Sequence, residues 1–207
     1  MLLSCYIVVG VKFMTANIEQ KIIEATINCI EKYGLENVTN SLISEEAEVN
    51  SAAVSYYFRG KDNLIRIAQE TALRNGFEWA DYAQTEGLHP REQLKAILIQ
   101  LAEGAQRYPN LTKSFFADAF LRGDYSGLGV QKLNEFLRVV LEHIQPKCPS
   151  VGPETLKSVI YRTFCGGVLP VITFPRLLDN FLGGAADNKD AVSAHIEALI
   201  DRLWEEV

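Results

Sequence analysis

The sequence lacks the features that mark several classes of protein. Its cysteines, Cys5, Cys29, Cys148 and Cys165, lie far apart with no Cys-x-x-Cys pair, and its three histidines are isolated. We therefore expect no metal site and no disulfide framework, which indicates a reducing, cytoplasmic compartment. Cys29 and Cys165 fall in apolar periodic stretches, where we expect them to be small buried side chains.

Positive charge is also scarce. The 207 residues carry 20 Lys and Arg against 26 Asp and Glu, a net charge of −6. A protein that coats nucleic acid or a membrane surface through bulk positive charge is therefore excluded. The hydrophobic fraction of 48% and the charged fraction of 22% are those of a globular chain, which is long enough to bury a core without metal or disulfide bonds.

Catalytic motifs are missing as well. The chain has no Gly-x-Ser-x-Gly, no phosphate-binding loop, no His-Glu-x-x-His and no paired carboxylates on one helix face. We expect no catalytic residues, no cofactor and no enzymatic activity. No apolar run reaches the length of a membrane span, so we expect no membrane partner either.

The first 13 residues, MLLSCYIVVGVKF, differ in composition from the rest. Their short apolar run has no basic residue before it and no clean cleavage site, so a signal peptide is a poor fit. Two interpretations stay open. Met14 is the natural start, or residues 1–13 pack as an apolar extension.

From residue 17 onward the apolar residues recur at helical spacing nearly throughout, and no strand pattern is present. The pattern predicts an all-α fold. We expect Asp62 to cap a long helix that runs to about Thr85, and a helix from about Leu111 to Arg122. The last two long helices are expected over about 153–169 and 189–206, and Gly166-Gly167 in the first of these favours a close approach of another helix.

Residues 39–61, TNSLISEEAEVNSAAVSYYFRGK, carry the most informative pattern. Two helices this short with so tight a link suit a crossed helix-turn-helix pair. Val54 and Phe58 provide apolar contacts for the crossing, and Asn50 is a good N-cap for the second helix. The small residues that follow Asn50 let the start of this helix approach a nucleic-acid backbone or groove closely.

The stretch from about residue 22 to 64 is similar to the DNA-binding domain of TetR-family transcriptional regulators. The resemblance is carried by Tyr33-Gly34, Val38-Thr39, Ala47-Glu48-Val49-Asn50, Tyr56-Tyr57-Phe58 and Lys61 with Leu64, in this order and spacing. Three positions depart from the family pattern. Glu48 replaces the turn glycine, so either it adopts glycine's backbone conformation without glycine's freedom or the turn is slightly altered. Ser44 replaces an alanine, and Ser55 replaces an aromatic residue.

The resemblance implies a DNA-binding role for particular residues. Thr39, Tyr56, Tyr57 and Lys61 would hold phosphates, and Asn50, Ser51, Ala52 and Ala53 would meet base edges or backbone. Packing of the tyrosines against the first helix is the alternative. Because Ser51 and two alanines offer little hydrogen bonding, we expect contacts to thymine methyl groups and readout of DNA shape.

The resemblance also implies an organisation into an N-terminal extension (1–13), a DNA-binding domain (14–62) and a ligand-binding and dimerisation domain (63–207). The dimer interface would use Leu156, Ile160, Phe164, Ile196, Leu199 and Leu203, with a core stripe inside one chain as the alternative. A largely apolar effector would contact Trp79, Tyr82, Gln100, Phe115, Phe116, Phe120 and Phe136, although aromatic residues at helical spacing are more often core.

The function implied is that of a ligand-responsive regulator, usually a repressor, that binds a palindromic DNA site as a homodimer and is released by a small-molecule effector. Two other classes stay open: a helical enzyme or carrier that contains a helix-turn-helix-like pair, and a protein-interaction module. The acidic N-terminal region favours the interaction module. A positive surface around Tyr56 and Lys61 would argue against it.

Overall fold

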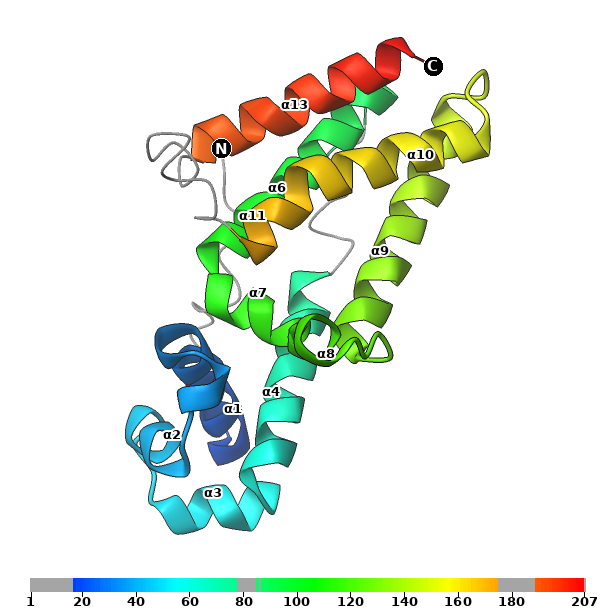
Figure 1. Cartoon of the computed structure of the whole chain (residues 1–207). Helices are drawn as coiled ribbons and strands as arrows, with labels where there is room; N and C mark the ends of the chain where they lie inside the picture. The colour runs from blue at the N-terminus through cyan, green and yellow to red at the C-terminus, as the bar shows by residue number, and fades with distance from the viewer. Residues whose placement is uncertain (1–16, 78–84, 86, 175–188, 207) are drawn as a thin grey trace. The chain divides into compact units, whose positions relative to one another are not determined.

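The computed structural model of the chain describes residues 17–77, 85, 87–174 and 189–206. All regular secondary structure in these ranges is helical, which confirms the predicted all-α fold (Figure 1). The chain divides into two compact units. The helix-turn-helix unit comprises Met1–Asp81 and Tyr108–Lys132, and the bundle unit comprises Tyr82–Arg107 and Leu133–Val207.

Across residues 17–77, the helix-turn-helix unit begins with four α-helices and one short 3₁₀ helix. In chain order they are α1 (Ile18–Tyr33), the short η1 (Leu35–Asn37), α2 (Asn40–Glu46), α3 (Ser51–Phe58) and α4 (Lys61–Gly76). Two further short helices return to this unit, α7 (Pro109–Phe115) and α8 (Ala117–Arg122). The side chain of Asn17 caps the start of α1, and Gly34 ends it with a φ of 79°.

One hydrophobic core holds these helices together. Its isoleucines come from α1 and α2, Val54 and Phe58 come from α3, and α4 adds Leu64, Ala68 and Ala72. Leu111 of α7, which is distant in sequence, is also buried in this core. The core therefore depends on a helix that follows the DNA-binding sequence pattern by more than 40 residues.

In the part of the chain that the structure describes, the bundle unit is built from four long helices and three short helical segments around an apolar centre. They are α6 (Pro90–Arg107), the larger part of α9 (Leu128–Ile144), η3 (Gln145–Lys147), α10 (Pro153–Thr163), the π-helical turn η4 (Phe164–Val168), α11 (Leu169–Thr173) and α13 (Lys189–Glu205). Helix α13 packs along α6, as Figure 1 also shows. Lys95 of α6 pairs with Asp201 of α13 at 2.6 Å across this contact.

Gly166 and Gly167 lie where η4 meets α13. A Cβ atom on Gly167 would lie 2.9 Å from Cγ1 of Ile196, and one on Gly166 would lie 3.4 Å from Cδ1 of Leu199. The predicted close approach at this glycine pair is confirmed, and it occurs inside one chain. The backbones come together because neither glycine carries a side chain.

Two of the predicted helices differ from those in the structure. Helix α4 starts at Lys61, with Gly60 rather than Asp62 in the N-cap position, and it ends at Gly76 instead of near Thr85. The segment from Leu111 to Arg122 is two helices, because Phe116, with φ −115° and ψ 9°, leaves the helical conformation. Pro109 occupies the first turn of α7, where a missing N–H costs nothing, so α7 begins earlier than predicted.

Other expectations have mixed outcomes. Cys29 is buried as predicted, and burial raises the pKa of its thiol, whereas Cys165 is only half-buried. Residues 1–13 and Met14, together with Trp79 and Tyr82, lie outside the described residues. Within the part of the chain that is described, no helix is both long and apolar enough to cross a bilayer.

Candidate nucleic-acid interface

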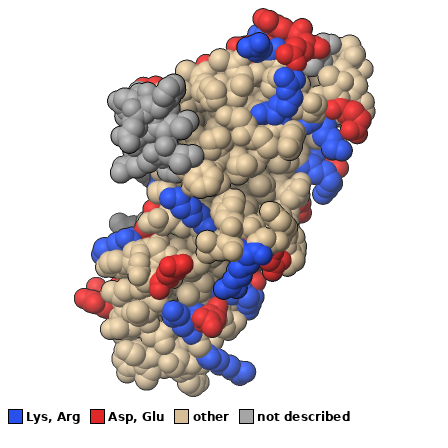
Figure 2. Space-filling model, viewed as in Figure 1, with Lys and Arg blue, Asp and Glu red and all other residues tan. Residues whose placement is uncertain are grey.

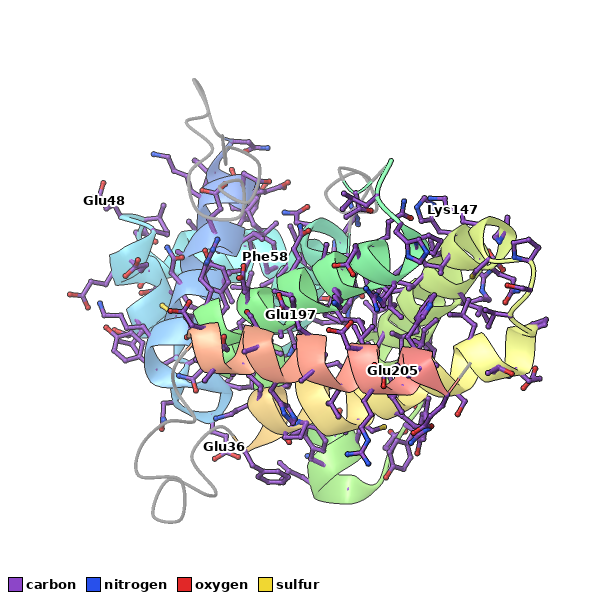
Figure 3. The ribbon with its side chains drawn as sticks, turned by 90° about the horizontal axis from the view of Figure 1, so that it is seen from above. Glu36, Glu48, Phe58, Lys147, Glu197 and Glu205 are labelled. Carbon is purple, nitrogen blue, oxygen red and sulfur yellow. The ribbon has the colours of Figure 1, made fainter. Side chains whose placement is uncertain are left out.

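The link between α2 and α3 is a tight turn whose conformation is set by Glu48. Its φ of 54° is in the left-handed region that favours glycine. The expectation that a non-glycine residue holds this conformation is confirmed. The Glu48 side chain is exposed and points away from the ribbon at this end of the unit (Figure 3).

Asn50 caps α3, as predicted. Its Oδ1 accepts hydrogen bonds from the backbone N–H groups of Ala52 at 2.6 Å and Ala53 at 3.2 Å. Free amides at the start of a helix are a common site for phosphate oxygens. Here these two amides already have a partner, so the first turn of α3 offers its small side chains rather than a set of free N–H groups.

The two faces of α3 have opposite characters. Val54 and Phe58 are 1% and 5% exposed and belong to the core. The opposite face exposes Ser51, Ala52, Ser55 and Tyr56, the last with 80% of its surface accessible. These positions form one stripe along the helix, which is the geometry needed to enter a DNA groove.

The two tyrosines of α3 have different surroundings. Tyr57 is half-buried and packs against the hydrophobic core, while Tyr56 projects into solvent. Their rings meet edge to face with centroids 5.2 Å apart. The core supports Tyr57, and Tyr57 in turn supports Tyr56 in an exposed position where its hydroxyl can reach a phosphate.

Ser44 of α2 contacts the first residue of α3. Its hydroxyl donates to the carbonyl oxygen of Ser41 at 2.9 Å and lies 3.3 Å from Oγ of Ser51. Because the single proton of Ser44 is used on Ser41, Ser51 is the donor of the second bond. An alanine at position 44 cannot make this contact, so this departure from the family pattern has a structural consequence.

Lys61 and Thr39 come together at the start of α2. The ammonium group of Lys61 donates to the carbonyl oxygen of Val38 at 3.1 Å, which places it beside Thr39. The Thr39 Oγ1 atom accepts the N–H of Leu42 at 3.3 Å and so caps α2. The ammonium group keeps two further donors and the threonine keeps its O–H, so the pair still offers hydrogen-bond donors to one phosphate.

Arg59 was not among the residues predicted for the site. It follows α3 directly, is exposed and adopts a left-handed conformation with a φ of 56°. The nearby exposed acids, Glu45, Glu46 and Glu48, lie on α2 and its turn. On the face drawn in Figure 2, basic and acidic side chains are interspersed over the surface. Cations close to α3 are therefore few and individually placed.

The residues predicted to bind an effector lie in both units. Phe115, Phe116 and Phe120 belong to the helix-turn-helix unit, where Phe115 packs against the core, Phe116 is buried and Phe120 is half exposed. The ring centroids of Phe116 and Phe120 are 6.1 Å apart. Gln100 and buried Phe136 belong to the bundle unit. Their role in effector binding stays a prediction.

The residues predicted for a dimer interface lie largely inside one chain. Five of the six are buried there, and Leu199 is half-buried. These five are Leu156, Ile160, Phe164, Ile196 and Leu203. The outer faces of the same helices carry exposed residues instead, among them Tyr161 on α10 and Glu197 and Glu205 on α13 (Figure 3).

Comparison with known proteins gives a consistent result. Residues 22–67 match the family model for bacterial regulatory proteins of the tetR family. The chain is 35% identical over 80 residues to the HTH-type transcriptional regulator BetI of Stenotrophomonas maltophilia, covering 38% of this chain and 41% of the relative. It is 30% identical over 117 residues to the HTH-type transcriptional repressor KstR of Rhodococcus jostii, covering 53% of each chain. The matched segment thus spans about half the length of these relatives.

Solved structures share the fold across nearly the whole chain. A TetR-family transcriptional regulator from Streptomyces coelicolor superposes with a TM-score of 0.64 at 15% identity, covering 92% of this chain and 95% of that one. A TetR-like transcriptional regulator from Rhodococcus sp. RHA1 gives 0.61 at 16% identity, covering 95% and 100%. Taken with the helix-turn-helix geometry, these matches show that residues 22–67 are similar to the DNA-binding part of tetR-family regulators and that the chain has a TetR-like fold.

Proposed function

We propose that this protein binds a palindromic duplex DNA site as a homodimer, represses transcription there, and is released by a small, largely apolar effector. The observation that carries the proposal is the exposed stripe of α3, which includes Tyr56, together with the hydrogen-bond donors of Lys61 and Thr39. Since its target is chromosomal DNA, the protein acts in the cytoplasm.

The phosphate contacts divide between two places. Thr39 and Lys61 act together at the start of α2, while Tyr56, Tyr57 and Arg59 act at the end of α3. Asn50, Ser51, Ala52 and Ala53 form the part that meets the bases. Phosphate contacts fix the docking angle, and the base-facing residues then determine which sequence is preferred.

Dimerisation is the step that gives useful affinity. The net charge of −6 and the few cations around α3 predict weak, salt-sensitive binding by one copy. Two copies joined through the outer faces of α10 and α13 would place two recognition helices on successive major grooves, about 34–36 Å apart. Tyr161, 66% exposed on α10, is the largest apolar group on that surface of α10.

Oligomeric state is tested by sedimentation at several concentrations. Tyr161→Glu is expected to shift the protein toward monomer, because a carboxylate would be buried at the interface. Leu121→Glu, at an exposed position of α8, is the matched control and should leave the dimer intact. A monomer in the unmodified protein at micromolar concentration would contradict this part of the proposal.

A polar group inside the bundle unit supports effector binding. The Thr163 hydroxyl is fully buried, and its oxygen has no hydrogen-bond partner among the described residues. Thr163 directly precedes the π-helical turn η4, a feature often found at functional sites. Gln100 and Phe136, which belong to the same unit as Thr163, are proposed to supply further contacts. The effector would favour a conformer whose recognition helices no longer match the half-site spacing, so that DNA and effector weaken each other's binding reciprocally.

DNA binding is tested by selecting duplexes from a random-sequence library with the full-length protein. The selected site should be a palindrome bound far more tightly than unrelated DNA. Lys61→Ala is expected to weaken binding to all sequences and to lower the slope of log K against log salt by about 1. Arg59→Asn removes a charge while keeping a residue that tolerates the left-handed conformation, so it should act in the same way. Binding that stays at the non-specific level would favour a protein-interaction module.

A further inference from the structure

We infer that the base-facing surface of α3 recognises the C5-methyl group of thymine by apolar contact. It does not read base edges through side-chain hydrogen bonds. This inference rests on the proposed function and specifies what its DNA site contains. The evidence is the combination of side chains at the start of α3 and the bonds in which they are already engaged.

Side chains capable of a two-bond contact with a base are absent from α3. Its sequence, SAAVSYYF, contains no Arg, Lys, Asn, Gln, Asp or Glu. Those residue types provide the paired donors and acceptors that distinguish guanine, adenine and cytosine in the major groove. Arg59 follows the last residue of the helix, whereas base contacts in helix-turn-helix proteins come from the N-terminal part of the recognition helix.

The polar groups at the start of α3 are occupied. Adenine recognition by Asn50 would need its amide oxygen and nitrogen together, but the oxygen accepts two backbone N–H groups. The proton of Ser51 is directed to Ser44. Ser51 keeps only acceptor lone pairs, and Asn50 keeps only its N–H donors, so neither provides a two-bond base contact.

What remains at the start of the helix is apolar. Ala52 is exposed, Ala53 is half-buried beside it, and their methyl groups are the remaining side-chain atoms of this turn. In the major groove the C5-methyl group of thymine is the apolar feature of an A·T pair. Contact between this group and Ala52 removes both from water without requiring a hydrogen bond. Ser55, one turn later, adds a single hydroxyl.

The test replaces thymine by uracil, which keeps base pairing and removes only the methyl group. The duplex is the one selected by the full-length protein. The dT positions of the half-site are changed to dU one at a time, and each change is made at the equivalent position of both half-sites. At one or two positions per half-site the affinity is expected to fall about fourfold for each methyl removed, the value for one methyl-sized group. All other dT to dU changes should leave the affinity unchanged.

A second arm assigns the contact to Ala52. Ala52→Gly removes the protein methyl group, so the ratio of affinities for the dT and dU duplexes should fall to about 1 at the sensitive position. Ala52→Ser is the backup if the glycine variant folds poorly, since glycine in a helix costs about 1 kcal/mol. Leu121→Ala, at an exposed position of α8 outside the stripe, is the control and should keep the full ratio. The ratio compares two duplexes with one protein sample, so it does not depend on the active fraction.

A third arm separates thymine from methylated cytosine, which carries the same group. Each dC of the half-site is replaced by 5-methyl-dC, and no gain in affinity is expected. A gain here without any loss on dU substitution would overturn the assignment to thymine. Ala53→Gly is measured in the same way as Ala52→Gly. Equal binding of all dT and dU duplexes, or an unchanged ratio of dT to dU affinity in both glycine variants, would overturn the inference itself. If no duplex is selected at all, the proposed function fails instead.

Discussion

The carboxylate of Glu31, near the end of α1, accepts a 2.9 Å hydrogen bond from the backbone N–H of Leu111 in the first turn of α7. The side chain of Asn110 donates to the backbone oxygen of Glu31 at 2.8 Å, so the two segments are joined twice. A separate bond links α4 to α7, from Gln69 to the carbonyl oxygen of Ser114 at 3.0 Å. Helix α7 is therefore attached to the DNA-binding helices by specific polar bonds as well as by its buried leucine.

Glu31 makes stability depend on pH. Burial raises the pKa of its carboxyl, although the N–H groups of α7 act in the opposite direction. The folded state then binds a proton more readily than the unfolded state, so stability is highest below the unfolded pKa of about 4.5 and falls as pH rises through the folded value. Glu31→Gln removes this loss while keeping an oxygen for Leu111. At pH 7 the variant should be as stable as the unmodified protein or more so, by less than about 1 kcal/mol.

The measurement for Glu31 is urea denaturation at several pH values. The advantage of Glu31→Gln over the unmodified protein should shrink as pH is lowered through the raised folded pKa, and it should vanish below 4.5, where the Glu31 side chain is neutral in both states. Glu36→Gln, the same substitution at an exposed position in η1, is the control for the chemical change itself. The comparison is the difference in free energy of unfolding between Glu31→Gln and the unmodified protein. If this difference disfavours the variant more at pH 7 than at pH 4, the charge of Glu31 itself is required.

Leu111 contributes to the core of the helix-turn-helix unit, where it is 4% exposed. Leu111→Ala leaves a cavity and should lower the free energy of unfolding by about 2–4 kcal/mol. Leu121→Ala, at a residue of α8 that is 74% exposed, is the matched control and should change it by less than about 0.5 kcal/mol. Denaturant titration checks both, and similar values for the two variants would contradict the packing described for α7.

Glu48 and Glu45 are neighbouring exposed acids in different backbone conformations. Glu48→Gly relieves a left-handed conformation that costs roughly 1–2 kcal/mol, and part of this gain is lost to the greater freedom of the unfolded chain. We expect a net stabilisation of about 0.5–1 kcal/mol. Glu45→Gly, inside α2, should destabilise by about 0.5–1 kcal/mol. Thermal melting compares the two, and a change of the same sign in both would mean that backbone conformation is not the cause.

Two glycines of the bundle unit should respond to alanine in opposite directions. Gly167→Ala places a Cβ atom 2.9 Å from Cγ1 of Ile196 and should destabilise by about 1–3 kcal/mol, because α13 must move away. Gly104→Ala, within α6, meets nothing within 4 Å and should stabilise by about 0.5–1 kcal/mol. Calorimetric melting of both variants is the check. An unchanged melting temperature for Gly167→Ala would show that the contact is easily relaxed.

Local features of the site could be predicted from the sequence. Asn50 is a strong N-cap residue, Val54 and Phe58 share one helix face, and Glu48 stands where the family pattern needs a left-handed residue. Each of these conclusions depends on a few neighbouring positions. The same is true of the all-α fold, since helical spacing is evident in each segment separately.

Contacts between distant segments could not be predicted. The bond from Lys61 to Val38 crosses 23 positions, and that from Leu111 to Glu31 crosses 80. Periodicity identifies the apolar face of a helix but not the helix that covers it. Thus the apolar pattern of α10 and α13 fits a dimer interface and the interior of one chain equally well. In the structure most of these residues are buried inside one chain.

The position of Leu111 also restricts how the protein can be rearranged. The stretch that matches the tetR-family model ends at residue 67, yet the helices within it share their core with a leucine 44 positions further on. A chimera that transfers only residues 17–77 to another regulator would lack Leu111 and expose the part of the hydrophobic core that Leu111 covers. Exchange of DNA specificity between such proteins therefore requires either the transfer of α7 or a host helix that covers the same part of the core.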